Sequence, residues 1–212
     1  MTNLSAILKN HLGGKEHSIC DLECSCCSSV FKVMDFDKIK DAFCINFSIP
    51  EHAKLASADG LHINDAKKRV CFIEMKDINK FLSATLFASG TSDSTDEIRS
   101  EFDFKAFRRL FDAWLDDKNR SLRNKVADSV FITISALTKY SANTTDAAEF
   151  IDKNKVEIKY VALLNISSEN FIKYKLAGLN QRLAYGMLTG PQCIPAVIRA
   201  VGFDKYVSSE LI

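Results

Sequence analysis

Two β-rich runs joined by a short polar turn constrain this chain more than any other feature of its sequence. Residues 59–63 (DGLHI) and 69–76 (RVCFIEMK) flank the turn NDAKK at 64–68, and this pattern predicts an antiparallel hairpin. The second run is apolar on both faces, which is typical of a strand that is covered on both sides. We therefore expect a layered domain with residues 69–76 inside its sheet.

The position of the turn determines which residues face each other. If the turn is centred between Ala66 and Lys67, Asp59 stands opposite Glu74, and Lys76 shares a face with Glu74. Two carboxylates in this arrangement repel each other, and apolar neighbours limit their solvation. A hard divalent cation, Mg²⁺ or Mn²⁺, would offset both effects. The ammonium of Lys76 could then orient or deprotonate a metal-bound water beside a phosphate.

This arrangement resembles the motif of the PD-(D/E)XK nuclease superfamily, in which an acidic residue and a hairpin precede a Glu-x-Lys segment. The motif reads here as Ala58-Asp59, residues 60–73, then Glu74-Met75-Lys76. The resemblance implies a restriction-endonuclease-like α/β (α+β) fold, with a central mixed sheet of four to five strands flanked by helices. It also implies that Asp59, Glu74 and the Met75 carbonyl bind the metal and that Lys76 is catalytic. The chain departs from the family name at Ala58, where the proline would stand.

A second Glu-x-Lys, at residues 157–159, serves as an internal control. It also lies in a predicted strand, so the tripeptide alone carries little information. Residues 141–154 before it read as loop and helix and supply no strand with an aligned acid. The hairpin therefore distinguishes the copy at 74–76, and the alternative reading of that copy is a solvated pair of charges at a sheet edge.

The resemblance also suggests two further kinds of site residue that the sequence leaves open. Relatives carry another acid on the first helix, and the candidates here are Glu16, Glu23, Asp37 and Asp41. Relatives also carry a basic or amide side chain on a later helix, and the candidates for a phosphate contact are Arg123, Lys125, Gln181 and Arg182. Each of these is alternatively part of a solvated helix face.

Hydrophobic spacing predicts the remaining elements. We expect helices over 1–12, over 102–137 as two helices broken near 116–119, and over 169–188 after a Ser167 cap, and strands over 42–49 and 155–166. Trp114, with Phe107, Leu110 and Phe111, is expected in the core. We expect a single domain over 1–212, with residues 1–29 as a cysteine-rich appendage and a core over about 30–190.

A cluster of possible metal ligands lies near the N-terminus, at His17, Cys20, Cys24, Cys26 and Cys27. Its spacing is not that of a common zinc site, so we favour buried or redox-idle cysteines over zinc. Cys44, Cys71 and Cys193 lie in apolar runs and are expected in the core. We expect no disulfide.

Charge and composition limit the functional classes. Lys plus Arg is 28 against 27 for Asp plus Glu, and this balance disfavours tight, non-specific DNA binding by the chain alone. Seven cysteines, no signal-like N-terminus and no long apolar segment predict a cytoplasmic protein without a membrane association.

The leading hypothesis is a Mg²⁺- or Mn²⁺-dependent DNA endonuclease that works with a partner protein or as a homodimer. By analogy, bacterial defence against phage (antiviral defence) or repair would be its setting. The alternatives are a non-catalytic interaction subunit with a nuclease-like fold and an RNA-directed nuclease.

Overall fold

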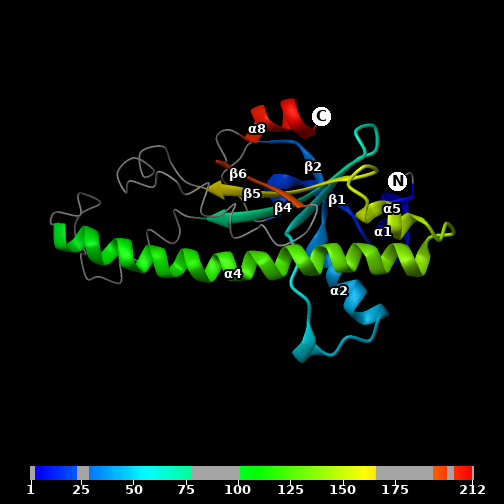
Figure 1. Ribbon diagram of the computed structural model, residues 1–212, viewed down its shortest axis with the longest axis horizontal. Helices are drawn as coiled ribbons and strands as arrows, with labels where there is room; N and C mark the ends of the chain where they lie inside the picture. The colour runs from blue at the N-terminus through cyan, green and yellow to red at the C-terminus, as the bar shows by residue number, and fades with distance from the viewer. Residues whose placement is uncertain (1–2, 23–28, 78–100, 166–192, 200–202, 212) are drawn as a thin grey trace.

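A mixed β-sheet forms the centre of the computed structural model, which describes residues 3–22, 29–77, 101–165, 193–199 and 203–211 (Figure 1). The strands are β1 (Glu16–Ser18), β2 (Lys32–Asp35), β3 (Gly60–Asn64), β4 (Arg69–Asp77), β5 (Glu157–Asn165) and β6 (Cys193–Arg199). They lie side by side in chain order, antiparallel from β1 to β4 and parallel from β4 to β6. The predicted α+β class with a mixed sheet is confirmed. Within the described residues the sheet has six strands rather than four or five, because the three-residue β1 adds an edge strand.

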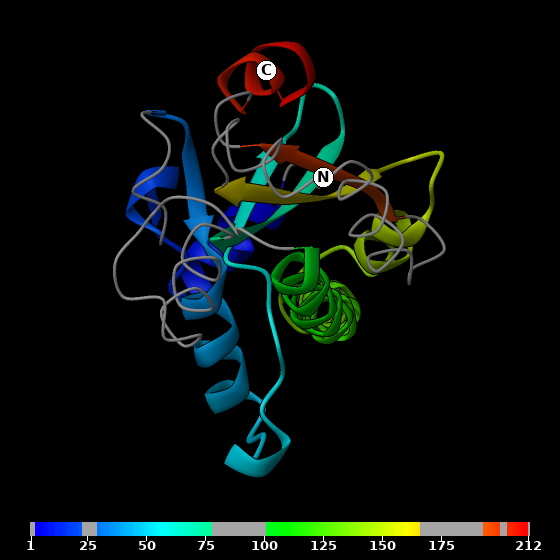
Figure 2. The ribbon, with the colours of Figure 1, turned by 90° about the vertical axis from the view of Figure 1, so that its left-hand side faces the viewer.

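Helices cover both faces of this sheet. They are α1 (Leu4–Leu12), α2 (Phe36–Asn46), α4 (Glu101–Tyr140), α5 (Asp146–Ile151) and α8 (Phe203–Tyr206), with short turns η1 (Ile19–Asp21), η2 (Glu51–Ala53) and η4 (Val207–Leu211). Figure 2, in which α4 is seen nearly along its axis, shows α4 on one side of the strands and α8 on the other. No helix within the described ranges is both long and apolar enough to cross a lipid bilayer.

The hairpin β3–β4 has the predicted register. Leu61 pairs with Phe72, and Ile63 pairs with Val70, which places the centre of the turn between residues 66 and 67. The turn is closed by a hydrogen bond of 3.0 Å from the Lys67 N–H to Asn64 Oδ1. Because side chains alternate along a strand, β4 contributes to two separate cores.

Each face of β4 packs into its own hydrophobic cluster. Val70 and Phe72 join the larger cluster with α1, α2, α4 and α5. Cys71 and Ile73 join the smaller cluster, which includes Phe203 of α8. The predicted strand with two covered faces is confirmed, and the face that carries Val70 and Phe72 also carries Glu74.

The strand predicted over residues 42–49 is wrong, because that segment belongs mainly to helix α2. The Asp35 carboxylate caps the helix by accepting a hydrogen bond of 3.0 Å from the Lys38 N–H. Phe36, Ile39 and Phe43 are fully buried, and this spacing of three and four residues is helical. The helical spacing of apolar residues therefore begins at Phe36, six residues before the segment 42–49 that was expected to be a strand.

The break predicted near residues 116–119 is also wrong, since α4 is one helix of 40 residues. The segment 101–140 contains neither Gly nor Pro, the two residues that most disfavour a helix interior. Asp116 and Asp117 are exposed, so these polar residues lie on the solvent side of a continuous helix and do not require the helix to end. The long helix connects β4 to its parallel neighbour β5, as a parallel pair requires.

The N-terminal residues are part of the main body rather than an appendage. Helix α1 (Leu4–Leu12) lies within the predicted segment 1–12 and ends, as predicted, at Leu12, where Gly13 with its φ of 63° suits a glycine cap. Leu4, Leu8 and Leu12 of this helix are buried in the larger cluster. Strand β1 pairs with β2, and at the other end of the chain α8 completes the smaller cluster, beyond the expected core limit of 190.

Several predictions fall outside the described residues. They concern the helix over 169–188 with Ser167, Glu23, Gln181 and Arg182, the cysteines at 24, 26 and 27, and the side chains of Cys20, Cys193, Phe107, Leu110, Phe111 and Trp114. Cys44 and Cys71 are buried, as predicted.

Candidate metal centre

The structure brings Asp59, Glu74 and Lys76 together between the sheet and helix α4. Asp59 directly precedes β3, while Glu74 and Lys76 lie on the same face of β4. The Asp59 Oδ2 atom accepts a hydrogen bond of 2.6 Å from the Met75 N–H. The pairing of Gly60 with Ile73, continued by one residue, sets Asp59 beside Glu74 as the sequence predicted.

Helix α4 holds the loop that presents Asp59. The Ala58 N–H donates a hydrogen bond of 2.9 Å to Ser129 Oγ, and the Ala56 N–H donates one of 2.8 Å to Asp128 Oδ2. On the other side, the Asp59 carbonyl accepts a hydrogen bond of 3.1 Å from the Phe36 N–H at the start of α2. Hydrogen bonds to two helices, α2 and α4, therefore hold the backbone around Asp59 in place.

Two lysines surround the pair of carboxylates. Lys125, from α4, places its Nζ atom 2.7 Å from Glu74 Oε1 and 3.3 Å from Asp59 Oδ1. Lys76 Nζ contacts the same Glu74 Oε1 atom and lies 3.3 Å from the Met75 carbonyl oxygen. Two negative and two positive side chains thus form one charge-balanced cluster.

Glu74 is the most deeply placed member of this cluster, with no exposed surface. Burial, followed by the negative charge of Asp59, raises the pKa of Glu74, and the two lysines oppose this rise. The Tyr160 hydroxyl donates a hydrogen bond of 3.3 Å to Glu74 Oε2. Tyr160 went unnoticed in the sequence, because only the pairing of β5 with β4 brings it to this site.

The pKa of Lys125 is raised above its usual range. Burial lowers it, but attraction to Glu74 and Asp59 and hydrogen bonds to both carboxylates together outweigh burial. Lys125 was one of the predicted phosphate contacts, and the structure places it against the carboxylates instead. Arg123, the neighbouring candidate, is exposed.

The residues of the cluster fit a divalent metal such as Mg²⁺. Asp59 Oδ1 and Glu74 Oε1 converge on one ammonium, so the same two oxygen atoms are placed to share one small cation. Carboxylate and carbonyl oxygens are the donors that Mg²⁺ prefers, and water and substrate usually complete its octahedron. Within the described ranges, no third His, Cys, Asp or Glu joins the pair to make a larger ligand set.

The other acidic candidates lie elsewhere. Asp37, in the first turn of α2, accepts a hydrogen bond of 2.5 Å from Ser57 Oγ, two residues before Asp59. Glu16 pairs with Lys9 at 2.6 Å, and Asp41 lies 3.4 Å from Lys54 Nζ. Asp37 therefore contacts the loop that carries Asp59, whereas Glu16 and Asp41 form ion pairs with other lysines.

The second Glu-x-Lys behaves as the control suggested. Glu157 forms an ion pair of 2.5 Å with Arg69 Nε at the beginning of β4, and Lys159 Nζ lies 3.7 Å from Glu157. Arg69 lies on the opposite face of β4 from Glu74, because an odd number of positions separates them along the strand. This copy is accounted for by an ordinary ion pair between neighbouring strands.

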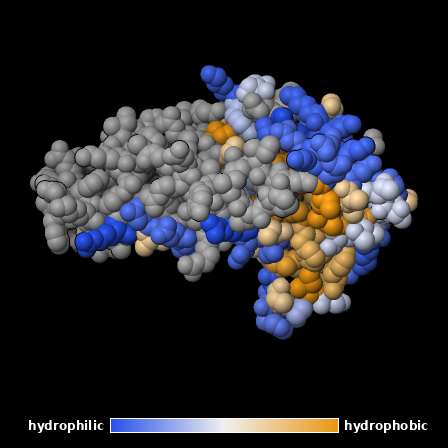
Figure 3. Space-filling view, in the orientation of Figure 1, coloured by the Kyte–Doolittle hydropathy of each residue, from blue (hydrophilic) through white to orange (hydrophobic). Residues whose placement is uncertain are grey.

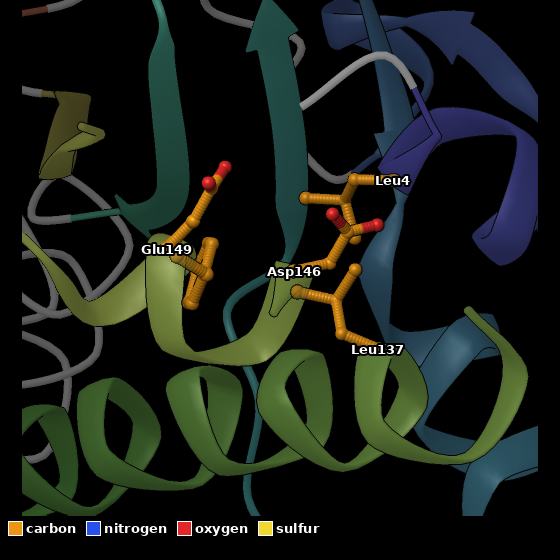
Figure 4. A pocket seen from close by; sticks show the side chains of 5 residues that line it. Leu4, Leu137, Asp146 and Glu149 are labelled. Atoms are coloured by element: carbon orange, nitrogen blue, oxygen red, sulfur yellow. The ribbon is translucent and has the colours of Figure 1, made fainter. Parts of the chain in front are cut away.

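The pocket in Figure 4 lies apart from these residues. It sits where α1, α4 and α5 meet, and its volume of about 10 Å³ has room for about one water molecule. A larger hollow of about 260 Å³ is lined by residues of β1, β2 and β3, including Glu16 and His62. Neither contains the pair of buried carboxylates.

Comparison with known proteins gives no relative: no family model, no curated protein and no solved structure matches the chain. The arrangement of Asp59, Glu74, Lys76 and Lys125 is therefore the feature of the molecule that indicates a function.

Proposed function

We propose that this chain is a Mg²⁺- or Mn²⁺-dependent nuclease that hydrolyses phosphodiester bonds of DNA. The observation that carries the proposal is the convergence of two buried carboxylates, Asp59 and Glu74, on one cation position. A lysine from the same strand adjoins them. The order of these residues along the hairpin is that of the PD-(D/E)XK motif, and the mixed sheet with helices on both faces supports a restriction-endonuclease-like fold.

The roles follow from the position of each side chain. Asp59, Glu74 and the Met75 carbonyl would hold the metal. Asp59 Oδ1 and Glu74 Oε1 both contact the Lys125 ammonium, and Glu74 Oε1 and the Met75 carbonyl both contact the Lys76 ammonium. The bound metal would supply a Lewis acid that makes water a stronger nucleophile and stabilises the charge on the phosphate. Lys76, whose ammonium lies between Glu74 and the Met75 carbonyl, would orient the attacking water and hold positive charge beside the phosphate.

A protein partner or a second copy of the chain belongs to the proposal. The net charge of +1 gives little general attraction to DNA, so a partner would supply part of the grip. Apolar side chains gather over α2 and the C-terminal half of α4 in Figure 3. Ile45 of α2 and Phe131 of α4 are 77% and 51% exposed, and exposed apolar surface of this kind supports a contact with another chain.

The deciding experiment is nicking of supercoiled plasmid with Mg²⁺, Mn²⁺ or EDTA, with a folded RNA as a parallel substrate. We expect cleavage of DNA that needs the metal and that disappears in both Asp59→Ala and Glu74→Ala, since each removes an anionic ligand. Cleavage of the RNA but not of the plasmid would mean that the nuclease acts on RNA rather than on DNA. No cleavage of either, together with no metal-dependent thermal shift, would favour the interaction subunit.

A further inference from the structure

The Lys125 ammonium lies at the point that the two carboxylates share. It contacts Glu74 Oε1 at 2.7 Å and Asp59 Oδ1 at 3.3 Å, and these are the oxygen atoms that would bind a metal in the proposed function. Lys76 contacts the same oxygen of Glu74. Without a metal, the two ammonium groups already balance the two carboxylates.

Lys125 and a divalent metal cannot use this point together. Mg²⁺ binds oxygen at about 2.0–2.1 Å, so an ion bridging the two carboxylates would lie where the ammonium now lies. Like charges at such a separation also repel strongly where burial limits screening. Loading the metal while keeping both lysines in place would leave the cluster with two surplus positive charges.

The position of Lys125 on its helix allows it to leave. It projects from α4 rather than from the sheet, and its side chain is 21% exposed, whereas Glu74 has no exposed surface. A lysine carries its charge on a flexible stem of four carbons. Its ammonium can therefore turn toward solvent while the two carboxylates stay in place. Glu74 is part of strand β4, and the Asp59 carboxylate accepts a hydrogen bond from the Met75 N–H of the same strand.

We propose that Lys125 is a built-in counter-cation that holds Asp59 and Glu74 together in the metal-free chain and that a divalent metal displaces. The inference rests on the proposed function, because it assumes the same metal site. It assigns Lys125 a positioning role, in which it keeps the carboxylates converged until the metal arrives. The energy of its ion pairs then opposes metal binding, so the lysine lowers the metal affinity of the site.

The test compares Mn²⁺ binding by calorimetry in the wild-type chain, in Lys125→Met and in Lys139→Met. Lys139 lies on the same helix, but its Nζ atom bonds the Asn46 carbonyl at 3.1 Å, which makes it a matched control. We expect Lys125→Met to bind Mn²⁺ at least about tenfold more tightly, equivalent to about 1.4 kcal/mol, and Lys139→Met to bind like the wild type. Equal affinity in all three proteins would overturn the inference while leaving the metal site intact.

A second measurement separates displacement from simple repulsion and needs no variant. Acetylation of lysines by a small reagent, read by mass spectrometry, should increase at Lys125 when Mg²⁺ is added and stay constant at Lys139. Unchanged labelling of Lys125 in a chain that binds the metal would overturn displacement. If the wild-type chain binds no Mn²⁺ at all, the proposed function fails and the inference fails with it.

Discussion

The carboxylate of Asp59 accepts a hydrogen bond of 2.6 Å from the backbone N–H of Met75. This bond joins the loop before β3 to the residue directly after Glu74, so it holds one acid beside the other. The bond also brings the two negative charges of Asp59 and Glu74 close together in a buried place, and the positive charges of Lys76 and Lys125 offset the resulting repulsion.

Lys76→Ala should separate catalysis from metal binding. The variant keeps both carboxylates, so its Mn²⁺ affinity should equal or slightly exceed that of the wild type, because a nearby positive charge is removed. Its single-turnover cleavage rate should fall by about a hundredfold or more, the scale for losing one preorganised group at a transition state. Calorimetry and single-turnover kinetics on the same samples measure the two effects. Wild-type cleavage by Lys76→Ala would remove this lysine from the mechanism.

Ser129→Ala should destabilise the fold through the loop that carries Asp59. Ser129 is fully buried, and its hydroxyl accepts the hydrogen bond from the Ala58 N–H. Leaving a buried N–H without a partner costs about 1–3 kcal/mol, which denaturant unfolding would measure. Thr138→Ala is the control, because Thr138 is exposed on the same helix and its hydroxyl bonds the Ile134 carbonyl. We expect the control to change stability by no more than about 0.5 kcal/mol.

Glu74 should give the metal-free protein a stability that falls as the pH rises. Its pKa is raised from the usual value of 4.5 by burial and by Asp59, so the folded state binds this proton more tightly than the unfolded state. Between pH 4.5 and the raised folded pKa, the folded state therefore holds more protons, and the free energy of unfolding decreases with increasing pH.

Urea unfolding in EDTA at several pH values, with Glu74→Gln as the reference, measures this dependence. The stability of the wild-type chain relative to Glu74→Gln should decrease across that window. A constant or increasing difference would mean that the lysines, rather than burial, dominate the titration of Glu74.

Leu8→Ala should show that the N-terminal helix belongs to the main core. Leu8 is fully buried among residues of α2 and α4, and truncating a buried leucine costs about 2–5 kcal/mol. Ile45→Ala, at a position that is 77% exposed, should cost no more than about 0.5 kcal/mol. Thermal or denaturant unfolding compares the two variants. A loss at Leu8 as small as that at Ile45 would mean that α1 is a separable segment.

The sequence by itself determined the hairpin and the neighbouring acids within it. Side chains alternate strictly along a strand, so the position of the turn was sufficient to place Leu61 opposite Phe72 and Asp59 next to Glu74. The same local reasoning identified α1 from the spacing of its leucines and its terminal glycine. These features depend on residues close together in the chain.

Only the tertiary structure decided what surrounds the two acids. Lys125 is separated from Glu74 by 51 residues and Tyr160 by 86, and no local pattern specifies which face of α4 meets the sheet or where β5 pairs. The strand predicted over 42–49 is wrong for a different, local reason: the apolar residues of that segment suit either period, and the helix is specified by the Asp35 cap and by the spacing that begins at Phe36. Periodicity describes a segment, whereas the charge balance around Glu74 arises from the contacts that folding brings together.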